Sequence, residues 1–335
     1  MSHALVVAPQ WIGDAVMTEP LLRRLAARGE RLTVGALPWV APVYRAMPQV
    51  AEVIEFPFAH GGLQFKARRS LAQQFAQRRQ PFDLAYVLPN SLKSALLPFL
   101  ASIPKRVGYL GEARIGLLTH RLKNPRHKPP MVAFYSALSG ETDLAADRPR
   151  LALDRAQTQA DLQAWALQPQ DYVVMAPGAE YGPAKRWPVN HFGELARQLH
   201  RQHGLRTVLL GSGKEAVLCE SIAQASPDAL NLAGKTELRQ ALSIISASKN
   251  VVSNDSGLMH VAAAFGVPQV ALFGSSSPLH TPPLNELAQV LWLKNDASYQ
   301  PALDCAPCFE RDCPLGHTRC LNDLGPERAF AAMLR

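Results

Sequence analysis

The sequence predicts an α/β protein with two Rossmann-like domains, each a parallel sheet covered by helices. Strand-like and helix-like segments alternate almost throughout the 335 residues, and this pattern is typical of parallel sheets. The alternation stops between residues 139 and 170, where no clear strand occurs, and then starts again. We therefore place the domains at residues 1–160 and 161–335. Because ligands of such sheets bind beyond the carboxyl ends of the strands, both sets of loops are expected to face a central cleft.

The elements follow from hydrophobic periodicity and from turn residues. Gly29 and Gly204 mark the ends of two of the predicted helices. In the first half, strands are predicted at 4–8, 32–37, 53–56, 84–88 and 107–110, and helices at 13–27, 70–78 and 91–100. In the second half, strands are predicted at 172–175, 207–210, 251–252 and 269–273, and helices at 189–203, 215–225, 237–247, 258–265 and 326–334.

The composition favours an anionic partner. The net charge is +8 and the isoelectric point is about 9.4, which favours phosphorylated sugars, nucleic acid or an anionic membrane surface. The denser basic stretches, such as 66–69 and 121–128, lie mostly in the first half. Each is also compatible with a solvated helix face, and none carries a nucleic-acid-binding motif. No apolar run reaches the roughly 20 residues of a membrane span, and the N-terminus does not resemble a signal peptide, so we expect a cytoplasmic protein.

Four of the five cysteines lie close together near the C-terminus, in the pattern Cys305-x2-Cys308-x4-Cys313-x6-Cys320. Thiols at this density could bind zinc. The spacing differs from that of standard zinc ribbons and fingers because it contains a single C-x-x-C pair. We favour a loop of reduced thiols with no metal, and a disulfide is not expected in a reducing compartment.

The turn at 254–257 joins a short strand to a helix and carries an acid and a hydroxyl, with His260 one turn further along. Helix N-termini present unpaired N–H groups and a partial positive charge, and therefore attract phosphate. The turn is thus a candidate site for a phosphorylated ligand. A serine hydrolase is a poor fit because Ser256 lacks the G-x-S-x-G elbow. A histidine near a helix start is often only structural, but the neighbouring Asp255 favours a functional role.

Three further loops end predicted strands. Asp14 follows the first strand, where it is either a functional carboxylate or an N-cap. Lys185 lies in the proline- and glycine-rich loop 177–188 and is suited to a phosphate. The segment 211–216 matches G-x-G-x-x-A, but no ribose-binding acid ends the next strand, so we reject a dinucleotide site. Glu215 is left either as a ribose ligand or as a first-turn acid.

Together these loops resemble glycosyltransferase family 9, the ADP-heptose lipopolysaccharide heptosyltransferases. The resemblance rests on Pro9-x-Trp11-x-Gly13-Asp14, on the run from Pro177 to Pro188, and on the run from Asn254 to His260, and it covers essentially the whole chain. It implies a GT-B fold, with the acceptor on the N-terminal domain, ADP-heptose on the C-terminal domain, and a last helix that packs back on the N-terminal domain. It also implies an inverting transfer of heptose to the first inner-core heptose, with no cofactor and no catalytic metal.

The resemblance further assigns roles to particular residues. Asp14 fits the catalytic base, and Lys185 the group that stabilises the departing diphosphate, while Asp255 orients Lys185, the donor sugar or the turn. The implied donor-binding residues are Gly178, Glu180, Lys185, Gly211, Glu215, Asp255, Ser256, Gly257 and His260. The basic candidates for binding the acceptor are Lys66, Arg68, Arg69, Lys93, Arg106 and Arg114.

The implied partners are ADP-heptose and Kdo2-lipid A that already bears one heptose. The implied location is the cytoplasmic face of the inner membrane of a Gram-negative bacterium, and we expect a monomer that binds no nucleic acid. Three alternatives remain open: another heptosyltransferase or a nucleotide-sugar enzyme of the same fold such as an epimerase, a non-catalytic nucleotide-sugar-binding protein, and a nicotinamide dehydrogenase. Product analysis distinguishes another transferase or an epimerase from the expected activity. The retention of Asp14 and Lys185 argues against a non-catalytic binding protein, and a measurement of NAD binding tests the dehydrogenase.

Overall fold

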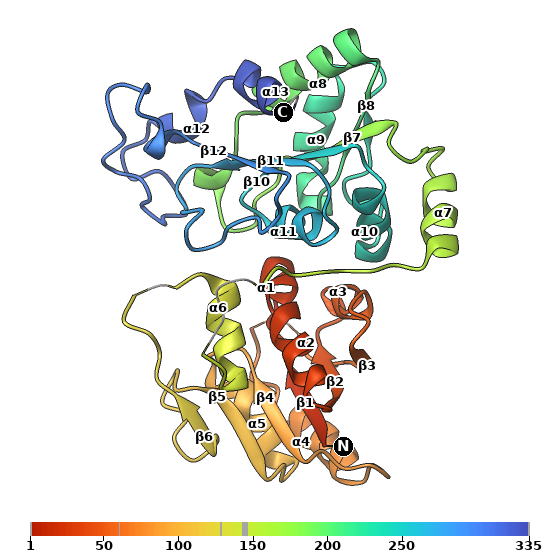
Figure 1. Ribbon diagram of the computed structural model, residues 1–335, viewed down its shortest axis with the longest axis vertical. Helices are drawn as coiled ribbons and strands as arrows, with labels where there is room; N and C mark the ends of the chain where they lie inside the picture. Colours follow the sequence, from red (N-terminus) through yellow and green to blue (C-terminus); the bar gives the residue numbers. More distant parts are fainter. Residues whose placement is uncertain (1, 60, 128, 143–146, 334–335) are drawn as a thin grey trace. The chain divides into compact units, whose positions relative to one another are not determined.

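The computed structural model describes residues 2–59, 61–127, 129–142 and 147–333. Lys128, in a predicted basic stretch, and Leu334, at the end of the last predicted helix, lie outside the described residues. The chain divides into two units, Met1–Ala152 and Leu153–Arg335. Each unit contains one six-stranded sheet in which all paired strands are parallel (Figure 1). The predicted α/β class is therefore confirmed.

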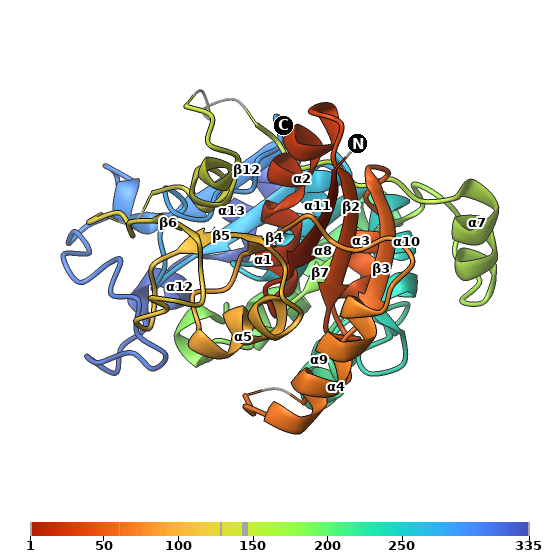
Figure 2. The same ribbon diagram turned by 90° about the horizontal axis from the view of Figure 1, so that it is seen from below.

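The sheet of the first unit has helices on both faces. Its strands are β1 (His3–Val7), β2 (Arg31–Ala36), β3 (Val50–Glu55), β4 (Leu84–Val87), β5 (Lys105–Tyr109) and β6 (His120–Leu122). Its helices are α1 (Ile12–Met17), α2 (Glu19–Ala27), α3 (Ala41–Arg45), α4 (Phe65–Ala76), α5 (Leu92–Leu100), α6 (Met131–Ser136) and the 3-10 turn η1 (Ala137–Ser139). The strand order is β3-β2-β1-β4-β5-β6. Figure 2 shows α4 and α5 on one face and α2 and α6 on the other.

The first predicted helix, residues 13–27, is in fact two helices that meet at Thr18. Pro20 lies in the first turn of α2, where a backbone N–H would have no partner within the helix and its absence carries no penalty. In the middle of one continuous helix the same proline would remove a hydrogen bond and break the helix. The Thr18 hydroxyl donates to the carbonyl oxygen of Ala15 at 2.7 Å. Asp14 therefore lies in the first turn of a short helix directly after β1.

The sheet of the second unit repeats this plan. Its strands are β7 (Tyr172–Ala176), β8 (Arg206–Leu209), β9 (Leu230–Asn231), β10 (Asn250–Asn254), β11 (Gln269–Phe273) and β12 (Ala288–Trp292). Its helices are α7 (Arg155–Gln163), α8 (Val189–His203), α9 (Ala216–Ala223), α10 (Leu238–Ser246), α11 (Gly257–Ala264), α12 (Arg319–Asn322) and α13 (Pro326–Met333), with 3-10 turns η2 (Pro183–Lys185), η3 (Gly213–Glu215) and η4 (Leu293–Asn295). The strand order is β12-β11-β10-β7-β8-β9. If β7 is counted as the first strand and the sheet is read from β9, this is the same order as in the first sheet.

The last helix belongs to the core of the second unit. Helix α13 packs on α8, and its Ala329 and Ala332 are buried in the same apolar cluster as Trp187. The indole N–H of Trp187 donates to the carbonyl oxygen of Leu324 just before α13, at 2.7 Å. The small side chains of α13 complete the core around Trp187. Whether the last helix also packs on the N-terminal domain, as the resemblance implied, stays a prediction.

In each sheet the strand order reverses once, between β1 and β4 in the first and between β7 and β10 in the second. The chain leaves these neighbouring strands in opposite directions, and in open α/β sheets ligands bind beyond the carboxyl ends of such strands. β7 and β10 are buried along their whole length. The loops that follow them are thus held on a rigid base.

Candidate active site

The predicted donor loops all lie at the carboxyl edge of the second sheet. Residues 177–188 follow β7, residues 211–215 follow β8, and residues 255–257 follow β10. Since β8, β7, β10 and β11 are neighbours in that order, these loops are adjacent along one edge. Residues 274–277, which follow β11, complete the row. The sequence therefore placed three of the four loops correctly at a common edge.

Lys185 and Asp255 form an ion pair at this edge. Lys185 Nζ lies 2.5 Å from Asp255 Oδ2, and the side chains are 18% and 6% exposed. Lys185 Nζ also lies 5.3 Å from the ring centroid of Tyr181. An ammonium group has three N–H donors, so the bond to Asp255 fixes its position and leaves donors for a ligand. The pair supports the role of Asp255 in orienting Lys185, which the sequence offered as one of three.

Asn254 fastens the loop after β7 to the end of β10. Its side chain is fully buried. Its Nδ2 donates to the carbonyl oxygen of Pro177 at 2.7 Å, and its Oδ1 accepts from the backbone N–H of Trp187 at 3.0 Å. Both ends of the Lys185 loop are therefore held by one amide. Sequence reasoning gave Asn254 no such role, although a buried amide beside an acid at a strand end is a signal that could have suggested it.

Helix α11 begins without a side-chain cap. Ser256 has the extended backbone of an N-cap residue, but its hydroxyl makes no cap hydrogen bond. That hydroxyl is buried and has no hydrogen-bond partner within the described part of the chain. Serine at this position normally accepts from the N–H groups of the first turn. The uncapped end, beginning at Gly257, therefore presents N–H donors and a partial positive charge to an anion.

His260 lies one turn into α11 and is buried, with 5% of its surface exposed. Burial lowers its pKa to about 4; the nearby Asp255 opposes this shift and Lys185 adds to it. At neutral pH the ring is therefore uncharged. His260 can offer a hydrogen bond to a diphosphate, but it carries no positive charge toward it.

A hydroxyl-rich turn after β11 was missed at the sequence level. The Oγ atoms of Ser275 and Ser276 are buried, and neither has a hydrogen-bond partner in the parts of the molecule that the structure describes. Thr281 Oγ1 donates to Asp255 Oδ1 at 3.4 Å. Buried polar atoms without partners are costly unless a ligand or water satisfies them. Three serines directly after a buried strand were the signal that this loop belongs to the site.

Glu215 closes the other end of the row. Its Oε2 accepts from the backbone N–H of Ser212 at 2.7 Å, and the Ser212 side chain accepts from the backbone N–H of Glu215, so the two residues form a capping box. Oε2 also accepts from the Ser212 hydroxyl at 3.1 Å. The first-turn role that the sequence left open is therefore present, and a ribose role stays a prediction. The Glu215 carboxylate also lies against Gly178 and Gly211. Nearby, Lys214 Nζ donates to Glu180 Oε1 at 2.8 Å in an exposed pair.

Gly178→Ala is expected to weaken ADP-heptose binding by displacing Glu215. A Cβ at Gly178 would lie 1.6 Å from Glu215 Oε1, so the carboxylate must shift from its present position. The matched control is Gly213→Ala, where a Cβ meets nothing within 4 Å. Calorimetric titration with ADP-heptose checks this. We expect a tenfold or larger rise in Kd, about 1.4 kcal/mol, for Gly178→Ala alone, and equal Kd values for both variants would contradict it.

Asp14 lies at the carboxyl end of β1, where the order of the first sheet reverses. Tyr135 of α6, which is buried, donates its hydroxyl hydrogen to Asp14 Oδ1 at 2.8 Å. Burial raises the pKa of Tyr135 well above its ordinary value, and the negative charge of Asp14 adds to this shift. Tyr135 therefore stays protonated and fixes the orientation of the carboxylate. The sequence gave no signal for Tyr135, because it lies 121 positions away from Asp14 along the chain.

Two of the basic acceptor candidates are structural. Arg114 is fully buried, and its guanidinium donates to the carbonyl oxygens of Pro89, at 2.7 Å, and of Tyr109. Burial lowers its pKa to about 10, so it remains charged. Arg68 is buried beneath the surface, with its guanidinium 4.2 Å from the Phe58 ring centroid. Their burial argues against a contact of these two arginines with an acceptor, and that contact stays a prediction.

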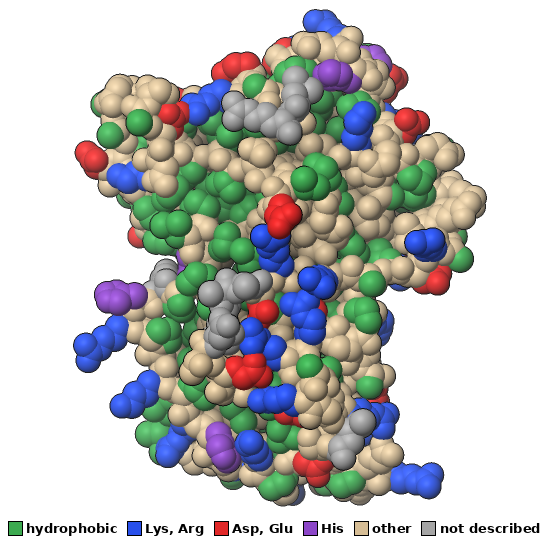
Figure 3. All heavy atoms as spheres, in the orientation of Figure 1, with side chains coloured by type: hydrophobic (Ala, Val, Ile, Leu, Met, Phe, Trp, Pro, Cys, Tyr) green, Lys and Arg blue, Asp and Glu red, His purple; other side chains and the backbone are tan. Residues whose placement is uncertain are grey.

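The other basic candidates are more accessible. Lys66 and Arg69 are exposed on α4. Lys93 Nζ donates to the carbonyl oxygen of Gly61 at 2.8 Å, and half-buried Arg106 donates to the carbonyl oxygens of Leu117 and Ile103. On the face drawn in Figure 3, Lys and Arg side chains of the first unit are spread over the surface, with acidic side chains among them. Among the described residues, no helix is both long and apolar enough to cross a membrane.

Comparison with known proteins shows similarity to one glycosyltransferase family over most of the chain. The model of glycosyltransferase family 9 (heptosyltransferase) matches residues 68–318. The chain is 40% identical to lipopolysaccharide heptosyltransferase 2 of Escherichia coli (strain K12) over 332 residues, which cover 90% of this chain and 94% of that protein. It is 42% identical to the protein of the same name from Salmonella typhimurium over 308 residues, covering 86% and 87%.

A solved structure, that of E. coli ADP-heptose LPS heptosyltransferase II, is similar over 100% of this chain and 99% of its own, with a TM-score of 0.83 and 36% identity. The predicted GT-B type of fold, with two Rossmann-like domains, is confirmed. The family model covers most of the chain and includes all four loops of the carboxyl edge of the second sheet. The chain therefore belongs to glycosyltransferase family 9, the heptosyltransferases.

Proposed function

We propose that the protein is a heptosyltransferase II, which transfers heptose from ADP-heptose to the first inner-core heptose of lipopolysaccharide with inversion at the anomeric carbon. The observation that carries this proposal is the Lys185–Asp255 pair beside the uncapped start of α11. This arrangement suits a diphosphate whose negative charge grows as it leaves. The similarity to heptosyltransferases 2 over most of the chain supports the choice of donor and acceptor.

The second unit binds ADP-heptose in this proposal. Lys185 donates to the diphosphate while Asp255 holds its ammonium group, and the first N–H groups of α11 donate to the same anion. Neutral His260 adds a hydrogen bond rather than charge. Gly178 and Gly211 let the backbone approach the nucleotide, and Glu215 accepts from the ribose hydroxyls.

The first unit supplies the base. The hydroxyl oxygen of the acceptor forms a bond to the anomeric carbon of the heptose, and the bond from that carbon to the ADP oxygen breaks. The carboxylate of Asp14 accepts the proton that the acceptor hydroxyl loses. Tyr135 holds the carboxylate through the 2.8 Å hydrogen bond to Oδ1. Because the base is already held in one orientation, the entropy of orienting a mobile side chain is not lost at each turnover.

The acceptor in this proposal is Kdo2-lipid A that bears one heptose, at the cytoplasmic face of the inner membrane of a Gram-negative bacterium. Its phosphates and the anionic lipid surface attract the net positive chain. Lys66, Arg69 and Lys93 are the candidates that we retain for these contacts, because they are not fully buried. Arg106 is retained with them, although two of its N–H groups already bond to backbone carbonyls.

One assay tests the proposal. The purified protein is given ADP-heptose together with either a core acceptor that carries one heptose or an otherwise identical core without heptose, and the products are identified by mass spectrometry. We expect one heptose to be added only to the first acceptor. Transfer to the heptose-free core would indicate the activity of a different heptosyltransferase. Binding of ADP-heptose without transfer to either core would favour a non-catalytic binding protein.

A further inference from the structure

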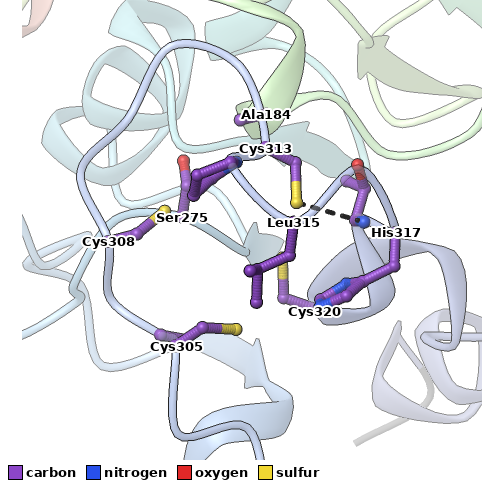
Figure 4. Close-up of a pocket in the computed structure, with 11 residues that line it drawn as sticks. Ala184, Ser275, Cys305, Cys308, Cys313, Leu315, His317 and Cys320 are labelled. Carbon is purple, nitrogen blue, oxygen red and sulfur yellow. Dashed lines mark hydrogen bonds between the residues drawn. The ribbon is translucent and has the colours of Figure 1, made fainter.

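Four cysteines outside the proposed donor site line one small cavity of about 20 Å³. They are Cys305, Cys308, Cys313 and Cys320, and all are free thiols. In Figure 4 the sulfur atoms of Cys313 and Cys320 turn toward each other, and that of Cys305 points into the same interior. A cavity of this size holds a single ion or water molecule and excludes any organic ligand.

The turn that carries Cys313 directs backbone donors at its sulfur. Gly316, with a positive φ of 71°, bends the chain so that its N–H donates to the carbonyl oxygen of Cys313 at 3.0 Å. The N–H of Thr318 then donates to Cys313 Sγ at 3.4 Å. A backbone donor aimed at the sulfur favours a thiolate, which is the form that binds metals.

The four thiols share one small cavity. Cys320 is the buried member of the group. Several thiolates around one small cavity repel each other unless a positive ion lies between them. His317 is engaged through Nδ1, which accepts from the N–H of Arg319 at 3.0 Å. Thiols are therefore the favoured ligands of this cavity.

From this cluster we infer that Cys305, Cys308, Cys313 and Cys320 bind one thiophilic metal ion, with zinc as the expected occupant. Four thiolates suit a tetrahedral zinc ion. Within residues 2–59, 61–127, 129–142 and 147–333, no three His, Cys, Asp or Glu side chains are arranged to hold a metal. Binding therefore requires the thiols to rotate toward the cavity. Three of the four cysteines lie in residues 301–318, which contain no helix or strand, and the fourth, Cys320, lies in the short helix α12.

The proposed ion would brace the donor site. Ala184 and Ser275 line the same cavity. The loop that carries the cysteines is already joined to both neighbours, because Ala184 N–H donates to the carbonyl oxygen of Arg311 at 3.0 Å and Phe309 N–H donates to that of Ser275 at 2.7 Å. A metal ion held by this loop would thus fix the positions next to Lys185 and at the end of β11. Its role is structural and involves no step of the transfer.

The test is metal analysis of the full-length protein purified under reducing conditions without chelators. We expect about one equivalent of zinc per chain by mass spectrometry of the elements. The Cys313→Ser/Cys320→Ser double variant should retain less than a tenth of this amount. Cys219→Ala, which alters the buried cysteine of α9 outside the cluster, should retain all of it. Iron in place of zinc would be recognised by its visible absorbance and would support the same site.

A second measurement uses only the wild-type protein, so its result does not depend on whether the cysteine variants fold. The wild-type protein is stripped of metal and titrated with Co²⁺, whose thiolate charge-transfer and intense visible bands report tetrahedral sulfur ligation. Saturation at one Co²⁺ per chain, with displacement by Zn²⁺, supports the site. The inference is overturned if the reduced wild-type protein neither contains nor takes up a metal ion while all its cysteines react as free thiols, or if the cysteines prove to be paired in disulfides.

Discussion

Asp14→Asn is expected to lower kcat for heptose transfer about 10²- to 10⁴-fold, the usual contribution of a positioned general base. The amide has nearly the shape of the carboxylate, but it does not accept a proton at neutral pH. The affinity for ADP-heptose is expected to remain within a factor of two, because the proposed donor loops belong to the other unit. Steady-state kinetics with the one-heptose acceptor, together with titration of ADP-heptose, separates the two effects.

Tyr135→Phe serves as the graded comparison. It removes the hydrogen bond to Asp14 Oδ1 and keeps the ring in its buried site. We expect kcat to fall about tenfold, which corresponds to about 1.4 kcal/mol and to the loss of one hydrogen bond to a charged group. If Asp14→Asn left kcat unchanged, the assignment of Asp14 as base would be refuted, whatever the behaviour of Tyr135→Phe.

Lys185→Ala is expected to lower kcat about 10²- to 10³-fold, since it removes the cation that stabilises the departing diphosphate. The same change leaves the buried carboxylate of Asp255 without its partner, and breaking such a pair costs up to about 3–5 kcal/mol of folding free energy. Loss of activity through unfolding must therefore be separated from loss of catalysis. Thermal unfolding and kcat are measured on the same preparations.

Two further variants make this separation. Lys185→Ala/Asp255→Asn removes both charges, so we expect its stability to recover toward that of the wild type while kcat stays low. Lys214→Ala removes an exposed lysine at the same edge of the sheet, whose partner Glu180 is also exposed, and should change kcat less than twofold. A double variant with recovered stability and recovered kcat would show that Lys185 acts only in folding.

Much of the fold could be predicted from periodicity alone. Buried parallel strands such as β7 and β10 are continuous apolar runs followed by polar turns, and such runs are readily recognised. The position of the donor loops followed, because the carboxyl ends of parallel strands share one edge. The break at Thr18 was missed because α1 and α2 have one continuous apolar pattern, and only the position of Pro20 separates them.

Side-chain burial was much harder to predict. Arg68 and Arg114 are in basic or loop segments that resemble solvated surface, and only tertiary contacts bury them. The same holds for Tyr135, which reaches Asp14 from a distant helix. Asn254 and the serines after β11 are visible as polar residues at strand ends, but which atoms meet which depends on sheet order. Charge and residue type indicate what a site can do, whereas burial decides which of its members are accessible.

The missing cap on α11 has a consequence for engineering. A natural N-cap contributes about 1 kcal/mol to stability, and Ser256 forgoes this contribution because its hydroxyl does not bond to the first turn. Ser256→Asp would supply such a cap and raise the melting temperature of the free protein. The added carboxylate would then occupy the donors that a diphosphate needs and would repel it. This helix start is thus a point where thermostability and turnover trade against each other, and screens for a more stable enzyme should leave it unchanged.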